Sequence, residues 1–367
     1  MIKRFAVFLS IMVSILTLGH YLVIITAKFF LGVSCGWPQW QMIAASMFMS
    51  LLFVVGNFVS FRFYNWFSKS LYLLVMLWIG LFNYLFFAAA AFWLLYDLGL
   101  QHSPLGLGYA LYGLAVVTAA YGIWNANQTR VTKYEVKLPG LPQNWIGKQI
   151  VFVSDTHFGQ IRNITFAKKL ASMINGLEPE MLLIGGDMFD GGRVPADELA
   201  KIFQTISAPQ GKFYVTGNHE EFTASRENVE ALPKHGIRVL DNDLAEVAGL
   251  QIAGVDYLKS ASEDGFRESL RKIQLNPNLP SVLIKHVPNR LEIAEEFGFS
   301  LQLSGHTHRG QMYPGRLFTK RIFKGYDYGL KDFKRMQVLV SSGAGTWGPA
   351  MRVGTVSEIL LITLQKK

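Results

Sequence analysis

The hydrophobic positions of the chain change pattern near residue 130. Before that point they form four apolar stretches, and each reaches the roughly 20 residues that a helix needs to cross a bilayer. Beyond that point they form short runs separated by polar segments. The pattern therefore predicts four membrane-spanning helices followed by a water-soluble part. The expected spans cover residues 5–27, 41–61, 71–96 and 105–127.

The soluble part alternates short, β-rich apolar runs with helical patterns. Because each run is short and ends directly in polar residues, it is typical of a buried strand. Strands that alternate with helices predict an α/β domain around a central sheet. The expected strands are 149–154, 181–185, 212–216, 281–285 and 301–304, and the expected helices are 164–175, 196–206 and 226–235.

Between the two parts, residues 131–138 alternate in the manner of a strand, and Pro139, Gly140 and Pro142 interrupt the pattern. The predicted organisation is a transmembrane region over 1–129 with four all-α spans, a linker over 130–147 and an α/β domain over 148–367.

The distribution of charge predicts an orientation in the membrane. Residues 5–128 contain only four charged side chains, whereas charges are dense from Arg130 onward. Lys and Arg are preferentially retained on the cytoplasmic side of a membrane, and four spans return the chain to the side on which it starts. We therefore expect a multi-pass inner-membrane protein with its soluble domain in the cytoplasm. The cations on the cytoplasmic side are Lys3, Arg4, Arg62, Lys69, Arg130, Lys133 and Lys137, with Lys28 opposite.

The formal net charge of +9 has a second source in residues 309–335, where Lys and Arg are interleaved with aromatic residues. This mixture suits binding to anionic lipid headgroups or to a phosphorylated substrate, and it suits a solvated basic loop equally well. The interpretation of this segment, including Arg309, stays open. A single cysteine, Cys35, excludes an intrachain disulfide.

Residues that can bind metal ions follow the expected strands. The first strand leads into Asp155 and His157, which are two positions apart and so point to the same face of an extended segment. The second leads into Asp187, whose two carboxylate oxygens can bridge two cations. The third leads into Asn218 and His219, and an amide oxygen is an acceptable ligand for a hard or borderline cation.

The last two strands lead into histidines, and five of the eight histidines of the chain follow expected strands. Loops at the carboxyl ends of strands in an open α/β sheet converge on one place. The sequence therefore predicts one metal centre built from five loops. The five histidines are His157, His219, His286, His306 and His308.

The polar groups after the five expected strands, taken in chain order, resemble the motifs of calcineurin-like metallophosphoesterases. The resemblance extends from about Lys148 to the C-terminus. The closer resemblance is to a transmembrane bacterial subgroup with a Gly-His-Thr-His-Gly-Gly-Gln block. The corresponding residues, 305–311, carry Arg309 in place of a glycine. Because of this departure, the substrate of the subgroup does not transfer directly to this chain.

The resemblance implies a four-layer α/β/β/α sandwich that holds two divalent metal ions, such as Mn, Zn, Fe or Ni. It implies that Asp187 bridges the ions and that His219 is a catalytic residue that contacts phosphate rather than a metal. Two such ions supply hydroxide near neutral pH and neutralise phosphoryl charge during in-line hydrolysis. The implied ligands are Asp155, His157, Asp187 and His308 for one ion, and Asp187, Asn218, His286 and His306 for the other.

The implied activity is hydrolysis of a phosphodiester, phosphomonoester or pyrophosphate bond. Since the family includes enzymes that cleave UDP-diacylglucosamine, a lipid-linked substrate is one expectation, with membrane lipids and not nucleic acid as partners. A nuclease or a cyclic-nucleotide phosphodiesterase is an alternative. A membrane sensor or transporter with a regulatory metal domain is an alternative of another class, which the nearly uncharged spans disfavour.

Three residues beside the motifs receive other interpretations. Asp190 is interpreted as a loop residue or helix cap. Glu220 is expected to support the site through hydrogen bonds rather than to act as a general base. For Arg352, a contact with substrate phosphate and a structural ion pair are both open.

Overall fold

The computed structural model describes residues 2–32, 36–100, 103–221 and 223–367, so Cys35 lies outside the described residues. The chain forms two compact units. The first contains the chain up to Trp124 together with Gly348–Met351. The second contains Asn125–Trp347 and Arg352–Lys367.

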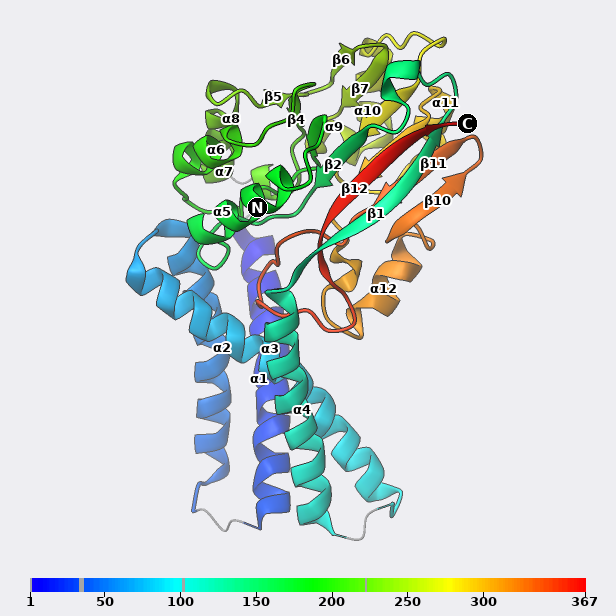
Figure 1. The fold of residues 1–367 in the computed structure, drawn as a ribbon. Helices are drawn as coiled ribbons and strands as arrows, with labels where there is room; N and C mark the ends of the chain where they lie inside the picture. Colours follow the sequence, from blue (N-terminus) through cyan, green and yellow to red (C-terminus); the bar gives the residue numbers. More distant parts are fainter. Residues whose placement is uncertain (1, 33–35, 101–102, 222) are drawn as a thin grey trace. The chain divides into compact units, whose positions relative to one another are not determined.

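Four helices make up most of the first unit, and each is long and apolar enough to span a membrane. This confirms the four predicted apolar helices. Figure 1 shows the helices in colours from blue to teal. They are α1 (Ile2–Leu31), α2 (Gln39–Arg62), α3 (Trp66–Asp97) and α4 (Pro104–Ala126), whose last two residues belong to the second unit.

Small residues allow close packing inside the first unit. A Cβ atom on Gly108 of α4 would lie 2.1 Å from the ring of Phe30 in α1. Glycine at such a position lets two helices approach closely without a hydrophobic driving force. A polar contact adds to this packing, because Nε1 of Trp78 in α3 donates to Nε2 of His20 in α1 at 2.9 Å.

The second unit contains two six-stranded sheets. The first sheet has the order β1 (Thr129–Leu138), β12 (Ser357–Lys366), β2 (Gln149–Val153), β3 (Met181–Ile184), β4 (Lys212–Tyr214) and β5 (Arg238–Val239). The second has the order β10 (Gly329–Phe333), β11 (Met336–Val340), β9 (Leu301–Ser304), β8 (Ser281–Ile284), β7 (Leu250–Gly254) and β6 (Asp243–Val247).

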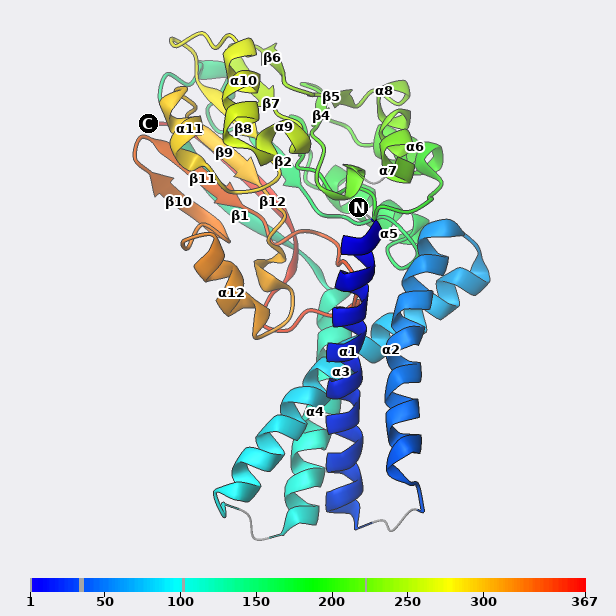
Figure 2. The same ribbon diagram turned by 180° about the vertical axis from the view of Figure 1, so that it is seen from behind.

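Helices cover the outer face of each sheet. Helices α5 (Ile164–Asn175) and α6 (Ala196–Gln204) lie against the first sheet, and α10 (Glu263–Lys272) and α11 (Leu291–Glu296) lie against the second (Figures 1 and 2). Their apolar side chains pack with those of the strands. The result is the predicted four-layer α/β/β/α sandwich. The shorter helical elements are η1 (Gln143–Trp145), η2 (His219–Glu221), α7 (Thr223–Val229), α8 (Ala231–Lys234), α9 (Tyr257–Ala261), η3 (His308–Gly310) and α12 (Gly315–Ile322).

Strand β2 explains why its apolar run is continuous rather than alternating. Val151 and Val153 pack beneath α5 and α6, whereas Ile150 and Phe152 belong to the core between the sheets. Successive side chains of a strand point to opposite faces, so a strand covered on both faces is apolar at every position.

The structure differs from two sequence expectations. Residues 130–147, expected as a linker, contain most of β1, which pairs in parallel with β12 from Thr129↔Ser357 to Leu138↔Lys366. Leu141 and Trp145 from the same range are buried between the sheets. The helix expected over 226–235 is divided into α7 and α8, because the ring of Pro233 is incompatible with a continuous helix through this segment.

Candidate metal centre

The loops after β2, β3, β4, β8 and β9 converge and bring all the predicted site residues together. β2, β3 and β4 come from one sheet, and β8 and β9 come from the other. Asn218, His219 and His306 are partly exposed. The remaining predicted ligands are at most 3% exposed: Asp155, His157, Asp187, His286 and His308.

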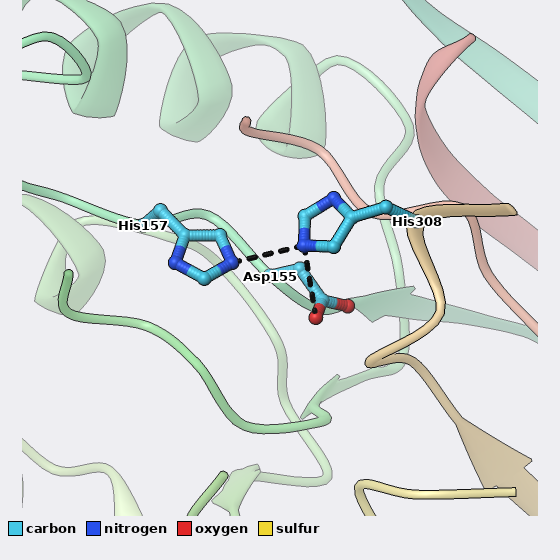
Figure 3. Close-up of side chains that lie close together, drawn as sticks. All are labelled: Asp155, His157 and His308. Carbon is cyan, nitrogen blue, oxygen red and sulfur yellow. Dashed lines mark hydrogen bonds and ion pairs between the residues drawn. The ribbon is translucent and has the colours of Figure 1, made fainter. Parts of the chain in front are cut away.

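Asp155, His157 and His308 form a first group (Figure 3). The Nε2 atoms of His157 and His308 face one another at 3.0 Å. Oδ1 of Asp155 lies 3.6 Å from Nε2 of His308. One carboxylate and two imidazoles in a buried cluster form a donor set that suits a divalent cation.

Asp187, His286 and His306 form a second group, with Asn218 beside it. Oδ1 of Asn218 lies 3.2 Å from Nε2 of His286 and 2.8 Å from Nδ1 of His306. Nδ1 of His286 donates to the backbone oxygen of Gly185 at 2.7 Å. This bond fixes the ring and leaves the Nε2 atom of His286 directed into the group, as a metal ligand requires.

Asp187 lies between the two groups. Its Oδ2 atom is 3.2 Å from Nε2 of His286 and 3.8 Å from Nε2 of His157. Its Oδ1 atom accepts from the backbone N–H of His219 at 2.8 Å. Gly217 permits this approach, because a Cβ atom there would lie 2.2 Å from Oδ1 of Asp187. One carboxylate thus reaches both groups.

The backbone at the site is left-handed at five of the seven predicted ligands. A positive φ is uncommon for residues other than glycine and costs about 1–3 kcal/mol when the surroundings impose it. Such residues cluster at functional sites, where a side chain must point in a particular direction. The φ values are 52° for Asp155, 46° for His157, 49° for Asp187, 68° for His306 and 45° for His308.

Burial sets the protonation state of the imidazoles. It lowers the pKa of His157, and burial together with His157 and Arg352 holds the pKa of His308 well below its usual range. Burial and the nearby His286 lower the pKa of His306 to about 3. His286 behaves differently, since burial lowers its pKa but Asp187 and Asp155 raise it to about 9. Apart from His286, these ligand rings are neutral at pH 7, which is the form that binds a metal.

The charge balance of the site fits divalent cations. Asp155 and Asp187 are both buried, and only one of the surrounding imidazoles, His286, has a raised pKa. Buried carboxylates are costly unless they are paired or coordinate a metal. A cation in each group would offset the negative charge of the two carboxylates. It would also bind the lone pairs of the imidazole nitrogens and carboxylate oxygens, which otherwise face one another.

Glu220 supports the site as expected. Its Oε2 atom accepts from the backbone N–H groups of Asp187 at 2.9 Å and Gly217 at 2.7 Å, and its Oε1 atom accepts from Phe189 at 3.0 Å. These three bonds hold the loops after β3 and β4 together.

Asp190 is a loop residue, as expected, and the structure adds contacts with two site imidazoles that the sequence did not predict. Its Oδ1 atom lies 3.3 Å from Nδ1 of His157 and 3.6 Å from Nδ1 of His219. Burial raises the pKa of Asp190 to about 7, while His219 acts in the opposite direction. The sequence signal that could have identified it is its position three residues after Asp187, in the same loop.

Arg352 is fully buried and has a structural role. Its guanidinium donates to the backbone oxygens of Ser342 at 2.7 Å and Gly345 at 2.7 Å, and Nη2 lies 3.2 Å from Nδ1 of His308. Arg352 therefore connects the 342–345 loop to the ring of His308.

Arg309, which departs from the subgroup motif, takes the conformation that a glycine would adopt. Its φ is 51°, in the left-handed region that glycine occupies without strain. Its guanidinium lies over the ring of Tyr328, 4.0 Å from the centroid. The stacking holds the Arg309 side chain beside the site.

A two-sheet α/β sandwich with this His, Asp and Asn cluster defines a metal-dependent phosphoester hydrolase. Residues 148–310 match the family model of calcineurin-like phosphoesterases. The chain is 32% identical over 263 residues to an uncharacterized metallophosphoesterase of Campylobacter jejuni, an alignment that covers 70% of this chain and 69% of that protein. It is 31% identical over 261 residues to an uncharacterized metallophosphoesterase of Aquifex aeolicus, with coverage of 69% and 98%.

A transmembrane protein with a metallophosphoesterase domain from Danio rerio is 30% identical over 270 residues, with coverage of 69% of this chain and 61% of that protein. Among solved structures, the NAD nucleotidase of Haemophilus influenzae matches with a TM-score of 0.33 and 17% identity, over 53% of this chain and 50% of that one. This chain belongs to the calcineurin-like metallophosphoesterases and carries four candidate membrane spans.

Proposed function

We propose that this protein is a membrane-anchored phosphoesterase that hydrolyses a phosphodiester, phosphomonoester or pyrophosphate bond of a lipid-linked substrate. The observation that carries the proposal is the position of Asp187 between two donor groups, each suited to one divalent cation. The four candidate spans favour a substrate that is itself held in the membrane. A nucleotide-linked diacyl lipid such as UDP-diacylglucosamine is the substrate class that we would test first.

Two metal ions, from among Mn, Zn, Fe and Ni, would be held by the predicted ligands. Asp187 would be shared, with Asp155, His157 and His308 on one side and Asn218, His286 and His306 on the other. When bound, such ions lower the pKa of a water molecule and neutralise charge on the phosphoryl oxygens.

His219 would act on the substrate rather than on a metal. Its ring lies edge-on to that of His157, with centroids 4.6 Å apart, and its Nδ1 atom faces Asp190. Burial, followed by His157, lowers the pKa of His219. Asp190, whose pKa burial raises to about 7, would share a proton with His219, so that the imidazole can donate to a phosphoryl or leaving oxygen.

The soluble unit would face the cytoplasm at the inner membrane. The positive flanking residues support this orientation, because four spans would put them on the same side of the membrane as the soluble domain, and Lys and Arg are preferentially retained in the cytoplasm. Labelling of single cysteines introduced between the second and third spans, and between the third and fourth spans, would test it in spheroplasts. Labelling of the cysteine between the second and third spans by an impermeant reagent would contradict the proposed orientation.

A substrate profile of the purified full-length chain tests the function. We expect Mn²⁺-dependent hydrolysis of nucleoside-diphosphate lipids in mixed micelles, and slower hydrolysis of water-soluble aryl phosphodiesters. Asp187→Asn should abolish both activities, whereas His235→Ala should retain them, because His235 pairs with Asp197 away from the site. Cleavage of plasmid DNA, or no difference between micellar and soluble substrates, would overturn the lipid-linked assignment.

A further inference from the structure

Exposed large apolar side chains of the second unit are concentrated in one place. Among its described residues, six such side chains are more than half exposed, and four of them lie between Tyr313 and Ile322. A fifth, Trp347, is joined to Gln311, two residues before this segment. The backbone N–H of Trp347 donates to Oε1 of Gln311 at 3.1 Å, and its backbone oxygen accepts from Nε2 of Gln311 at 2.9 Å. The concentration is unusual, because single exposed apolar residues are normally scattered. The six are Leu258, Tyr313, Leu317, Phe318, Ile322 and Trp347.

Helix α12 carries three of these six residues, and none of its own residues is buried. Phe318 and Ile322 are four positions apart and share one flank, while Arg316 and Lys320 share the other. Leu317 and Arg321 lie between the flanks. The helix thus presents an apolar strip beside a basic strip, as helices that lie in a membrane interface do.

The cations of this helix are not balanced by acidic residues within their own segment. The sequence from Arg309 to Tyr326 contains no Asp or Glu. Among the described residues, no ion pair is formed by the basic side chains of α12 and the turn that follows it. These side chains are Arg316, Lys320, Arg321 and Lys324.

The inner side of α12 is fixed against the metal-site loop. A Cβ atom on Gly310 would lie 2.2 Å from the backbone of Gly315 and Arg316, so the start of the helix packs tightly on the η3 turn. Oγ1 of Thr319 donates to the side-chain carboxylate of Asp327 at 3.3 Å. The backbone oxygen of Asp327 accepts from Oγ1 of Thr307, in the metal-site loop, at 2.7 Å. In Figures 1 and 2, α12 lies outside both sheets. The helix is held rigidly while its outer side is uncovered.

We infer that α12, with Tyr313 and Trp347, is a docking surface for an anionic lipid bilayer. The basic strip complements anionic headgroups, and the apolar and aromatic side chains reach the acyl boundary. This surface needs only a low intrinsic affinity for lipid. Candidate span α4 ends at Ala126 and β1 begins at Thr129, so the short connection keeps the second unit at a high effective concentration near a membrane. The experiment must distinguish a lipid bilayer from a protein partner at this surface.

This docking would orient the metal centre toward headgroups. Phe323, at the end of α12, lies edge-on to His306 with ring centroids 6.1 Å apart. The orientation toward a lipid substrate rests on the proposed function, but the docking itself does not.

The test uses the full-length chain with Cys35→Ser and Phe318→Cys, labelled with an environment-sensitive fluorophore and placed in nanodiscs. We expect a blue-shifted emission and roughly fivefold weaker quenching by aqueous iodide when phosphatidylglycerol is mixed into phosphatidylcholine, since each basic residue near an anionic surface changes partitioning by about that factor. High salt should reverse the shift.

Arg316→Glu/Lys320→Glu/Arg321→Glu should remove the response to phosphatidylglycerol. The matched control, Lys201→Glu/Lys234→Glu/Arg271→Glu, changes the charge equally at exposed positions elsewhere and should keep it. In the unlabelled chain, α12 amides should exchange more slowly in anionic than in neutral discs. Equal quenching in both lipid mixtures, or protection that persists in neutral detergent, would assign the surface to a protein contact and overturn the inference.

Turnover of a water-soluble aryl phosphodiester separates this inference from the proposed function. We expect the charge-reversal variant to retain that turnover within about twofold, because substitutions at exposed sites usually change stability little. A dead enzyme with an intact lipid response would refute the function and leave the docking in place.

Discussion

Oδ2 of Asp187 lies 3.2 Å from Nε2 of His286, and the two side chains stabilise one another's charged forms. Burial is the largest single influence and disfavours the charged form of both side chains. His286 nevertheless holds the pKa of Asp187 well below its usual range. Asp187 and Asp155 raise the pKa of His286 to about 9. In the metal-free protein this imidazole carries a proton at neutral pH, and a metal ion must displace that proton.

We therefore expect metal binding to release a proton from His286. Its pKa is raised on folding, so its contribution to metal-free stability is complete below its ordinary pKa and is lost as pH rises through about 9. Metal affinity should rise over the same range, by about tenfold per pH unit for one proton. Calorimetric titration with Mn²⁺ at pH 7 in two buffers of different ionisation enthalpy measures the proton. Identical heats in the two buffers would contradict this account.

Substitution of the shared carboxylate should affect both ions. We expect Asp187→Asn to lower the bound metal from two ions to one or none and to reduce turnover by at least about a thousandfold, since two-metal catalysis depends on both ions. Metal analysis of the purified variant measures the first effect. Asp197→Asn, an exposed carboxylate that pairs with His235, is the control. Two tightly bound ions in Asp187→Asn would rule out a bridging role.

His219 lies close enough to His157 and Asp187 to complete a third donor group, so its assignment needs a direct test. We expect His219→Ala to lose about 10²–10⁴-fold in turnover, which is the usual contribution of a general acid or base. Its metal content should be unchanged. Loss of one metal ion from this variant would instead make His219 a ligand.

Asp190 should act through the two imidazoles that it faces. Because Asp190→Asn keeps the size of the side chain but removes the negative charge, we expect a fall of about 10–100-fold in turnover with the metal retained. The pH profile of kcat should also shift, since the substitution removes a group whose pKa is about 7. An unchanged pH profile would argue that Asp190 only shapes the loop.

Arg352 should be required for stability. Replacing it with methionine leaves the backbone oxygens of Ser342 and Gly345 without their donor. We expect the free energy of unfolding of the second unit to fall by about 2–4 kcal/mol, because buried polar groups that lose a charged partner are costly. Thermal denaturation with and without metal measures this loss. Arg271→Met, on the exposed surface of α10, should change the melting temperature little.

The sequence was most informative where a strand is covered on both faces. Five strands begin at the predicted residues: β2, β3, β4, β8 and β9. β9 also ends where predicted, and the other four end one or two residues before the predicted end. Their apolar runs are continuous because helices cover one face and the opposite sheet covers the other. The site residues follow these strands directly, so locating the strands also located the site.

Elements with one exposed face or a distant partner were harder to predict. β6 and β10 carry polar residues because they lie at the edges of the second sheet, and their runs are not strongly apolar. β1 could be recognised as a strand but not placed in a sheet, since its partner β12 lies far along the chain. The roles of Asp190 and Arg352 depend on contacts across loops, which no local pattern records.

The placement of β12 between β1 and β2 has a consequence for the order of synthesis. β1 emerges from the ribosome directly after α4, yet it can find its neighbour only when residues 357–366 have been translated. Until then the nascent first sheet has a gap beside β2, which carries Asp155 and His157 at its end. The chain would thus reach the bilayer well before its metal centre can assemble, and chaperones or lipids would meet an open sheet edge in the interval.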